Sequence, residues 1–255
     1  MKDSKDPAEI EAYLKAYPDG AFAPLARMRI ERLKGTGASE AAEVEPAAQR
    51  QKAISDNAEA IFRSSHAVAA GNPSGDVTVV EFFDYNCGYC RRAMPDVLKL
   101  VDNDDKVRLV FKELPLFGDS SEAAAKGALA AHKQGKYFEM HQKLLSESGK
   151  ADKEKVLRIA NEIGLDVPRL EKDMEDHSVQ EALDEARSLA QKLDVQGTPF
   201  YLIGNRILPG APEDLYEQLT EKVAEVREMS AANASDASPP SVDDLDDLGD
   251  LDKLD

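Results

Sequence analysis

The stretch of this sequence that decides its fold is Glu81-Phe82-Phe83-Asp84-Tyr85-Asn86-Cys87-Gly88-Tyr89-Cys90. It contains the only two cysteines of the 255 residues. The apolar run that leads into it, residues 77–83, is typical of a buried strand. A cysteine pair with two intervening residues, placed directly after such a strand, predicts a redox site where the strand gives way to a helix.

The spacing of Cys87 and Cys90 suits an exchange reaction. Two thiols three positions apart at the start of a helix lie on one turn, so the first can attack a disulfide and the second can resolve the mixed disulfide. The amide groups at the helix start favour the thiolate of Cys87. Cys90, one turn inside the helix, should be more buried and less acidic. We therefore assign Cys87 as the attacking sulfur and Cys90 as the resolving sulfur.

Two other uses of a cysteine pair fit the sequence less well. A structural zinc site needs four ligands, and the chain has no second cysteine pair. The four histidines are scattered without the spacing of metal ligands: His66, His132, His141 and His177. A purely structural disulfide would close too short a loop to stabilise the fold much. We therefore expect neither a metal nor another cofactor.

Two charged residues stand in otherwise apolar strands near this pair. Glu81 lies six positions before Cys87, between Val80 and Phe82. A buried carboxylate is costly unless it is paired or transfers protons, so we expect Glu81 to take the proton from Cys90. Lys112, at the end of the second apolar strand, is a candidate partner for it. Two alternatives stay open, because strand faces cannot be fixed from sequence: Glu81 on a solvated strand edge and Lys112 on the surface.

Two prolines add to the pattern. Pro95 lies in the predicted active-site helix, where it would remove one backbone hydrogen bond and kink the helix. Far downstream, Gly197-Thr198-Pro199 opens another apolar strand. A Thr-Pro bond at such a position is a candidate cis peptide, and proline is tolerated at the first residue of a strand.

These features together resemble one known family. Residues 77–95 and the downstream Gly197-Thr198-Pro199 are similar to the DsbA-like branch of the thioredoxin superfamily of thiol-disulfide oxidoreductases. The segments 111–118 and 134–137 also look like this branch, in particular its bacterial envelope members. The resemblance covers about residues 54–228.

The resemblance implies roles for four residues beside the cysteines. Pro199 is expected to be cis and to pack against the cysteine pair, while the backbone of Thr198 faces a bound substrate peptide. We place Gly88 and Tyr89, between the two cysteines, on the same substrate-binding surface.

The resemblance also implies the fold, an α/β thioredoxin fold with a mixed sheet flanked by helices. More than a hundred residues separate Cys90 from Pro199, far more than in thioredoxin itself, and most of them have helical patterns. We therefore expect a helical insertion at about residues 119–193. Its helices are expected at about 120–134, 137–145, 153–163 and 179–193, with a strand at 205–208 and a closing helix at 213–226.

We divide the rest of the chain by composition. Residues 1–35 have the pattern of a tetratricopeptide-like helical hairpin, which cannot bury its own apolar face. Residues 36–53 are expected to be a linker, and a helix is expected over 49–70. Residues 229–255 are expected to be a disordered acidic tail. Its leucines suit a partner-docking motif, and a solubilising role is the open alternative.

Charge and the chain start limit the partners and the compartment. The formal net charge of -17 argues against nucleic acid as a partner. The opening residues 1–6 lack the apolar segment of a signal peptide, and no apolar run is long enough to span a membrane. Either the protein is therefore cytosolic, or the sequence starts after a removed targeting segment. The resemblance favours the periplasm or bacterial cell envelope.

We predict an enzyme that exchanges thiols and disulfides on unfolded or misoxidised protein substrates. The Gly-Tyr dipeptide carries no histidine to hold the thiolate, so we expect a milder oxidant than the strongly oxidising family members. This favours a disulfide isomerase or general exchange enzyme, with a membrane redox partner and a homo-oligomer built by the N-terminal helices. The alternatives are a dedicated disulfide-forming oxidase, or an envelope interaction and scaffold protein with a secondary redox domain.

Overall fold

The computed structural model describes Lys15 and residues 48–236. The chain divides into two compact units, Met1–Asp56 and Asn57–Asp255. In the first unit residues 48–56 are helical. Residues 48–53, expected to belong to the linker over 36–53, are therefore helical, because residues 48–56 contain helix-forming Ala, Gln, Arg and Lys but no Gly or Pro. Residues 36–47 lie outside the described residues. The predicted hairpin over 1–35 lies outside the described residues, except for Lys15, which is helical.

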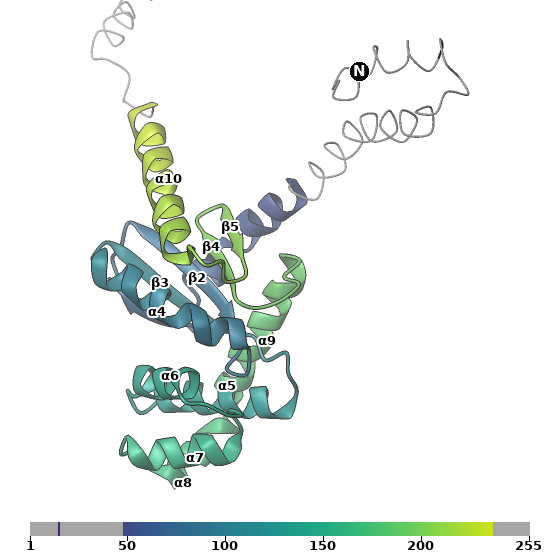
Figure 1. The fold of residues 1–255 in the computed structure, drawn as a ribbon, viewed down its shortest axis with the longest axis vertical. Coiled ribbons are helices and arrows are strands. Elements are labelled where there is room, and N and C mark those ends of the chain that lie inside the picture. Colours follow the sequence, from purple (N-terminus) through teal and green to yellow (C-terminus); the bar gives the residue numbers. More distant parts are fainter. Residues whose placement is uncertain (1–14, 16–47, 237–255) are drawn as a thin grey trace, which may run out of the picture. The chain divides into compact units, whose positions relative to one another are not determined.

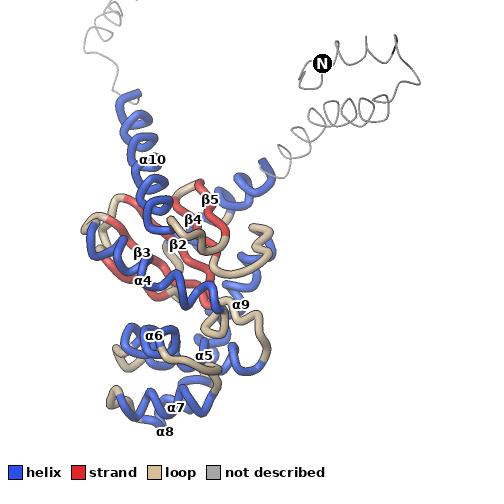
Figure 2. Tube along the Cα trace, in the orientation of Figure 1, coloured by secondary structure: helices blue, strands red, loops and turns tan. Residues whose placement is uncertain are grey.

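The described part of the second unit is built on a mixed five-stranded sheet with the order β1-β3-β2-β4-β5. The strands are β1 (Val68–Gly71), β2 (Val77–Phe83), β3 (Val107–Glu113), β4 (Phe200–Ile203) and β5 (Arg206–Pro209). β2 and β3 are parallel and joined by helix α4 (Gly88–Asn103), whereas the other neighbouring strands are antiparallel. The strands form one layer with helices around it (Figure 2). The central strand β2 therefore leads directly into the cysteine pair.

The two faces of the sheet have different helices. One face packs against α4 and α10 (Leu215–Asp236), and its core includes Val79 and Phe83 of β2 with Val97 of α4. The other face packs against α3 (Ala58–Phe62) and α9 (His177–Lys192). Because side chains alternate along a strand, each residue of β2 and β3 belongs to one of these two layers.

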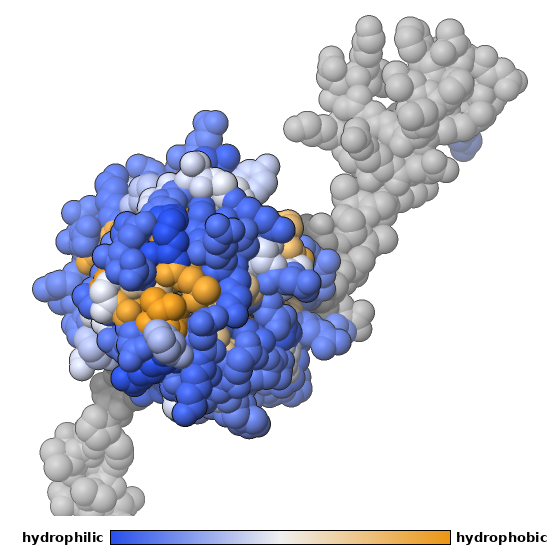
Figure 3. Space-filling model, turned by 90° about the horizontal axis from the view of Figure 1, so that it is seen from below, coloured by the Kyte–Doolittle hydropathy of each residue, from blue (hydrophilic) through white to orange (hydrophobic). Residues whose placement is uncertain are grey.

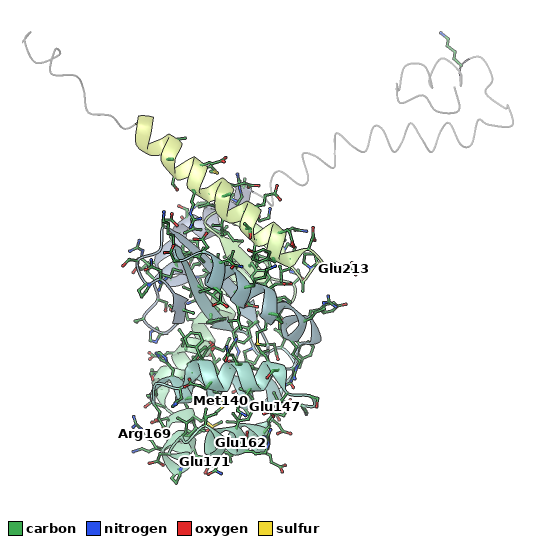
Figure 4. All side chains as sticks on the ribbon, turned by 60° about the vertical axis from the view of Figure 1, so that its left-hand side comes forward. Met140, Glu147, Glu162, Arg169, Glu171 and Glu213 are labelled. Carbon is green, nitrogen blue, oxygen red and sulfur yellow. The ribbon has the colours of Figure 1, made fainter. Side chains whose placement is uncertain are left out.

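The remaining helices form the expected insertion between β3 and β4, drawn below the sheet in Figure 1. They are α5 (Asp119–His132), α6 (Tyr137–Ser146), α7 (Lys153–Glu162) and α8 (Val167–Met174), and α9 leads back to the sheet. Asp152, Asp166 and Asp176 cap α7, α8 and α9 by accepting a backbone N–H. Two ion pairs connect α6 with α7, Arg158 with Glu147 and Lys143 with Glu162, and both glutamates are labelled in Figure 4.

The sequence predicted most of these elements, but it missed β1 and α8 and ended the closing helix too early. The helix expected over 49–70 stops at Phe62, because Val68–Gly71 pairs with β3 as β1 instead. Helix α8 was not expected, although Asp166 followed by Pro168 is a helix-start pattern. Helix α10 runs on to Asp236, so the tail expected to be disordered from 229 begins as helix, in a segment without Gly or Pro. Residues 237–255 lie outside the described residues.

Among the helices between residues 48 and 236, none is both long enough and apolar enough to cross a bilayer.

The insertion depends on one close contact, which yields a stability prediction. Gly127 of α5 faces Val156 of α7, and a Cβ added at Gly127 would overlap one Val156 methyl and lie 3.0 Å from the other. Gly127→Ala should therefore lower the free energy of unfolding by about 1–3 kcal/mol, despite the better helix propensity of alanine. Urea denaturation measures this.

The matched control is the double variant Gly127→Ala/Val156→Ala, in which the smaller side chain leaves room for the new methyl. The double variant should be less destabilised than the two single variants added together. Additive effects would show that the two helices do not meet as closely as the structure has them.

Candidate active site

The cysteine pair sits where β2 ends and α4 begins. Cys87 is the N-cap of α4 with an extended backbone (φ -77°, ψ 118°), and Cys90 lies in the first helical turn. Both are free thiols. Cys87 is 4% exposed and Cys90 is 1% exposed. Both residues are therefore buried, and Cys90 is the more buried of the two.

The two thiols differ in acidity. The Cys90 thiol and the backbone amides of Cys90 and Tyr89 hydrogen-bond to the Cys87 sulfur, and these bonds outweigh its partial burial and lower its pKa to about 5. Burial instead raises the pKa of Cys90 far above the ordinary thiol range, and the neighbouring Cys87 and Glu81 add to this rise. Cys90 is thus the more buried and the less acidic thiol, as the spacing predicted.

A distant part of the chain completes the site. The Thr198–Pro199 peptide bond is cis, as predicted. The Cys87 Sγ donates a hydrogen bond of 3.2 Å to the backbone carbonyl of Thr198, 111 positions further along the chain. The carbonyl of Pro199 in turn accepts a bond of 2.8 Å from the amide of Gly210. Cys87 and the Thr198–Pro199 pair therefore lie together where β2 ends and the neighbouring strand β4 begins.

Glu81 lies beneath the helix that carries the cysteines. Its register partners are Phe111 of β3 and Tyr201 of β4, on the face that packs against α4. It is buried, and Tyr201 Oη donates a 3.2 Å hydrogen bond to its Oε1. Burial raises the pKa of Glu81 to about 8. The structure therefore rules out the solvated strand edge and places a carboxyl group that can gain or lose a proton near neutral pH close to Cys90.

Lys112 does not pair with Glu81, and this corrects the sequence prediction. Its register partner is Phe82, so it points to the opposite face of the sheet. There Nζ donates to Glu185 Oε1 of α9 at 2.5 Å and to the Ala60 carbonyl of α3 at 2.8 Å. Lys112 is only 2% exposed, so the surface alternative is also wrong. The alternation of strand side chains separates it from the cysteine site.

The sequence did not single out Asn86 and Arg91, which tie this site to the insertion. Asn86 exchanges two hydrogen bonds with the backbone of Ala151, at 2.8 and 2.9 Å. Arg91 donates to the carbonyls of Tyr85, Glu147 and Gly149. Their position, one residue before Cys87 and one after Cys90, is a signal that could have been used. The partners lie some sixty residues away along the chain and could not be found from the sequence.

A buried polar cluster continues from the residue two positions before Cys87. Tyr85 Oη bonds with His141 Nδ1 of α6 at 3.1 Å, and Tyr137 Oη donates to Glu113 Oε1. Burial lowers the pKa of His141 to about 3 and raises the pKa of Glu113 to about 7. The imidazole is therefore neutral at physiological pH and can accept a hydrogen bond from the Tyr85 hydroxyl. This cluster fixes α6 against the end of β2.

Large apolar side chains are exposed in the first turn of α4 and on the loop between β3 and α5. Tyr89 is 58% exposed, Phe117 56% and Leu116 49%. The guanidinium of Arg92 lies 4.8 Å from the centre of the Tyr89 ring. Exposed groups of this size mark contact surfaces more often than chance. On the face drawn in Figure 3 most of the surface is hydrophilic, and a compact hydrophobic area stands out from it.

A shallow cavity of about 270 Å³ lies beside α4. Its polar lining comes from Arg92 and Asp96 of α4 and from Glu213, which is labelled in Figure 4. Arg92 also donates a 2.9 Å hydrogen bond to the carbonyl of Ala211 on the same rim. The cavity therefore adjoins the helix that carries the cysteines.

The acidity of Cys87 can be measured directly. In the reduced protein, the rate of alkylation by iodoacetamide should rise with pH through a midpoint near 5, because only the thiolate reacts. Mass spectrometry of the products should place the label on Cys87 and leave Cys90 unmodified at neutral pH. A midpoint near the ordinary thiol value of about 8.5 would contradict the hydrogen bonding described above.

The chain is similar to proteins of one known family. Residues 78–223 match the model of the DSBA-like thioredoxin domain. A thioredoxin-like oxidoreductase from Silicibacter pomeroyi is 48% identical, with 67% of this chain and 97% of that chain covered and a TM-score of 0.65. The thiol-disulfide exchange protein alpha-DsbA2 from Wolbachia pipientis is 32% identical, with 71% and 97% covered and a TM-score of 0.65.

Another relative is a much longer protein, and this chain matches only part of it. The Na(+)/H(+) antiporter NhaA 3 of Salinispora tropica is 33% identical over 138 residues, which cover 53% of this chain and 21% of the antiporter. This chain therefore matches about a fifth of that relative's length. The family match, in contrast, covers more than half of the 255 residues and includes the cysteine pair and the cis-proline. The chain belongs to the DSBA-like thioredoxin domain family, and the predicted thioredoxin fold with a helical insertion is confirmed.

Proposed function

We propose that this protein is a thiol-disulfide oxidoreductase that exchanges disulfides with protein substrates through Cys87 and Cys90. One observation carries the proposal: the Cys90 thiol hydrogen-bonds to the Cys87 sulfur and lowers its pKa to about 5, while this sulfur lies 3.2 Å from the Thr198 carbonyl. A purely structural pair would not need one acidic and one protected sulfur.

The reaction follows from this asymmetry. The Cys87 thiolate attacks a substrate disulfide, one substrate sulfur leaves as a thiolate, and a mixed disulfide forms. Cys90 then loses its proton and attacks Cys87 Sγ, which releases the second substrate sulfur and leaves a Cys87–Cys90 disulfide. The substrate gains two electrons and the protein loses them. In the reverse direction the oxidised pair forms a substrate disulfide.

Glu81 supplies the proton acceptor for the second step. Cys90 is too weak an acid to ionise unaided, because burial raises its pKa so far. The Glu81 carboxyl, with a pKa of about 8 and held by Tyr201, can exchange a proton with it near neutral pH. Lys112 has no part in this step, because it faces the other side of the sheet.

The substrate surface is formed by the loops around Cys87. Gly88 and Tyr89 continue the chain into α4, and Thr198 and Pro199 face Cys87 from the start of β4. The exposed side chains of Tyr89, Leu116 and Phe117 give this surface its apolar character. Extended segments of unfolded proteins expose such apolar groups beside their cysteines, so they are the substrates that fit.

The direction of the reaction is a finer proposal. The Gly88-Tyr89 dipeptide lacks a histidine, and we propose isomerase or general exchange activity ahead of dedicated oxidation. We place the protein in the periplasm or envelope, with a membrane redox partner. Assembly through residues 1–50 is tested by analytical ultracentrifugation with and without them. An envelope scaffold role stays the alternative if exchange activity is missing.

The redox assay tests both levels of this proposal. Cys87→Ser should abolish reduction of insulin and reshuffling of a scrambled disulfide substrate, whereas Cys90→Ser should accumulate mixed disulfides on Cys87. Unchanged activity in Cys87→Ser would contradict the proposal that the protein exchanges disulfides through Cys87. For the wild-type protein, an intermediate potential against glutathione with efficient reshuffling indicates an isomerase. A strongly oxidising potential with little reshuffling indicates an oxidase.

The role of Glu81 predicts a pH effect on the second step alone. In the wild-type protein the resolution rate should rise as pH passes about 8, where Glu81 loses its proton and can accept that of Cys90. Glu81→Gln should remove this inflection and slow resolution on the order of 10²-fold. Single-turnover kinetics of a preformed mixed disulfide report it, and alkylation of Cys87 is the control. Equal slowing of both steps would show that Glu81 is only structural.

A further inference from the structure

We infer that Asp84 is a positioning residue for substrate selection, which holds the exposed Leu116 and Phe117 in place beside Cys87 through one buried carboxylate. This inference rests on the proposed exchange function and deepens it. It concerns a residue that the sequence reading passed over.

The bonds of Asp84 join two separate loops. Its Oδ2 accepts the backbone amides of Leu116 at 2.6 Å and Phe117 at 3.3 Å. Its Oδ1 accepts the amide of Asn86 and the hydroxyl of Ser121, both at 2.7 Å. The residue is 2% exposed. One oxygen therefore holds the loop after β3, and the other holds the turn before Cys87 and the first turn of α5.

Two backbone hydrogen bonds stabilise the same turn and the ends of the two strands before these loops. The Cys87 amide donates to the Asp84 carbonyl at 3.1 Å, and the Leu114 amide donates to the Phe83 carbonyl at 2.8 Å. The ends of β2 and β3 thus stay side by side into their loops. The carboxylate then sets where Leu116 and Phe117 lie relative to Cys87.

Only an ionised carboxylate of this length serves both loops. Every partner named above donates, so each oxygen must accept. An asparagine of the same shape presents one NH₂ group, which cannot accept an amide N–H. It can therefore keep the bonds to the Leu116 loop or the bond to Asn86, but it cannot keep both. Asp84→Asn breaks the bridge with little change in volume.

The substrate that this surface selects is a cysteine peptide with aromatic or aliphatic neighbours. Leu116 and Phe117 are 49% and 56% exposed and carry no charge. A bound apolar segment would bury them at a gain, provided that the loop is already held in place. Loss of the bridge should then weaken binding of such peptides without changing the chemistry at Cys87.

The test compares two disulfides by stopped-flow kinetics with the reduced full-length protein. One is a peptide disulfide whose cysteine is flanked by Phe and Leu, and the other is hydroxyethyl disulfide, which has no side chains to recognise. Asp84→Asn should raise the half-saturating concentration of the peptide roughly three- to tenfold, the effect of about one lost hydrogen bond. The limiting rate and the rate with hydroxyethyl disulfide should not change.

A second background shows whether the effect passes through the loop. In Leu116→Ser/Phe117→Ser, which lacks the apolar groups, the added Asp84→Asn substitution should have no further effect on the peptide. Asp166→Asn is the matched control, because Asp166 caps α8 in the same way at 3.0 Å but lies in the insertion. It should behave as the wild-type protein does.

The outcomes distinguish a failure of the positioning role of Asp84 from a failure of the exchange function. Equal slowing with both disulfides, or an additive effect in the serine background, would overturn the positioning role and leave the exchange function standing. A wild-type protein inert to both disulfides would overturn the exchange function and this role with it. If Asp84→Asn does not fold, hydrogen exchange of the wild-type protein decides. The Leu116 amide should be protected on its exposed loop, and random-coil exchange there would contradict the bridge.

Discussion

The site depends on the close approach of Cys87 to Thr198, because this contact joins two parts of the chain that are 111 residues apart. The first half supplies a strand, a turn and the start of a helix. The second half supplies a cis Thr–Pro bond at the start of the neighbouring strand β4. The sheet holds the two in register, since β2 and β4 pair directly. The sulfur is therefore placed by a rigid scaffold rather than by a mobile loop.

The two faces of the sheet keep two buried charged groups apart. Glu81 lies on the α4 face with Tyr201, close to the sulfurs, and its neutral form is favoured by burial. Lys112 lies on the α9 face, where Glu185 and the Ala60 carbonyl satisfy its ammonium group. A lysine beside Glu81 would hold it as a carboxylate and lower its pKa. The separation leaves Glu81 able to exchange protons in the range where thiol chemistry takes place.

The insertion is fastened to the site by side chains that flank the cysteines. Asn86 and Arg91 reach backbone groups between residues 147 and 151, and Tyr85 bonds with His141 of α6. Asp84 holds the loop that leads into α5. Each of these four residues lies within four positions of a cysteine. The turn around the pair is thus the place where the sheet, the insertion and the loop after β3 meet.

Local sequence patterns were enough to predict the redox cysteine pair, the order of the main elements and the cis-proline. These follow from local patterns: the spacing of Cys87 and Cys90, an apolar strand before them and a Thr–Pro dipeptide before another. Only the tertiary structure decided which face each strand residue occupies, and so that Glu81 meets Tyr201 while Lys112 meets Glu185. It also decided that Val68–Gly71 is a strand, since its pairing partner β3 lies some forty residues away. The alternation of side chains along a strand divides its residues between two faces of the sheet. It does not show which helices cover each face, because those helices come from distant parts of the chain.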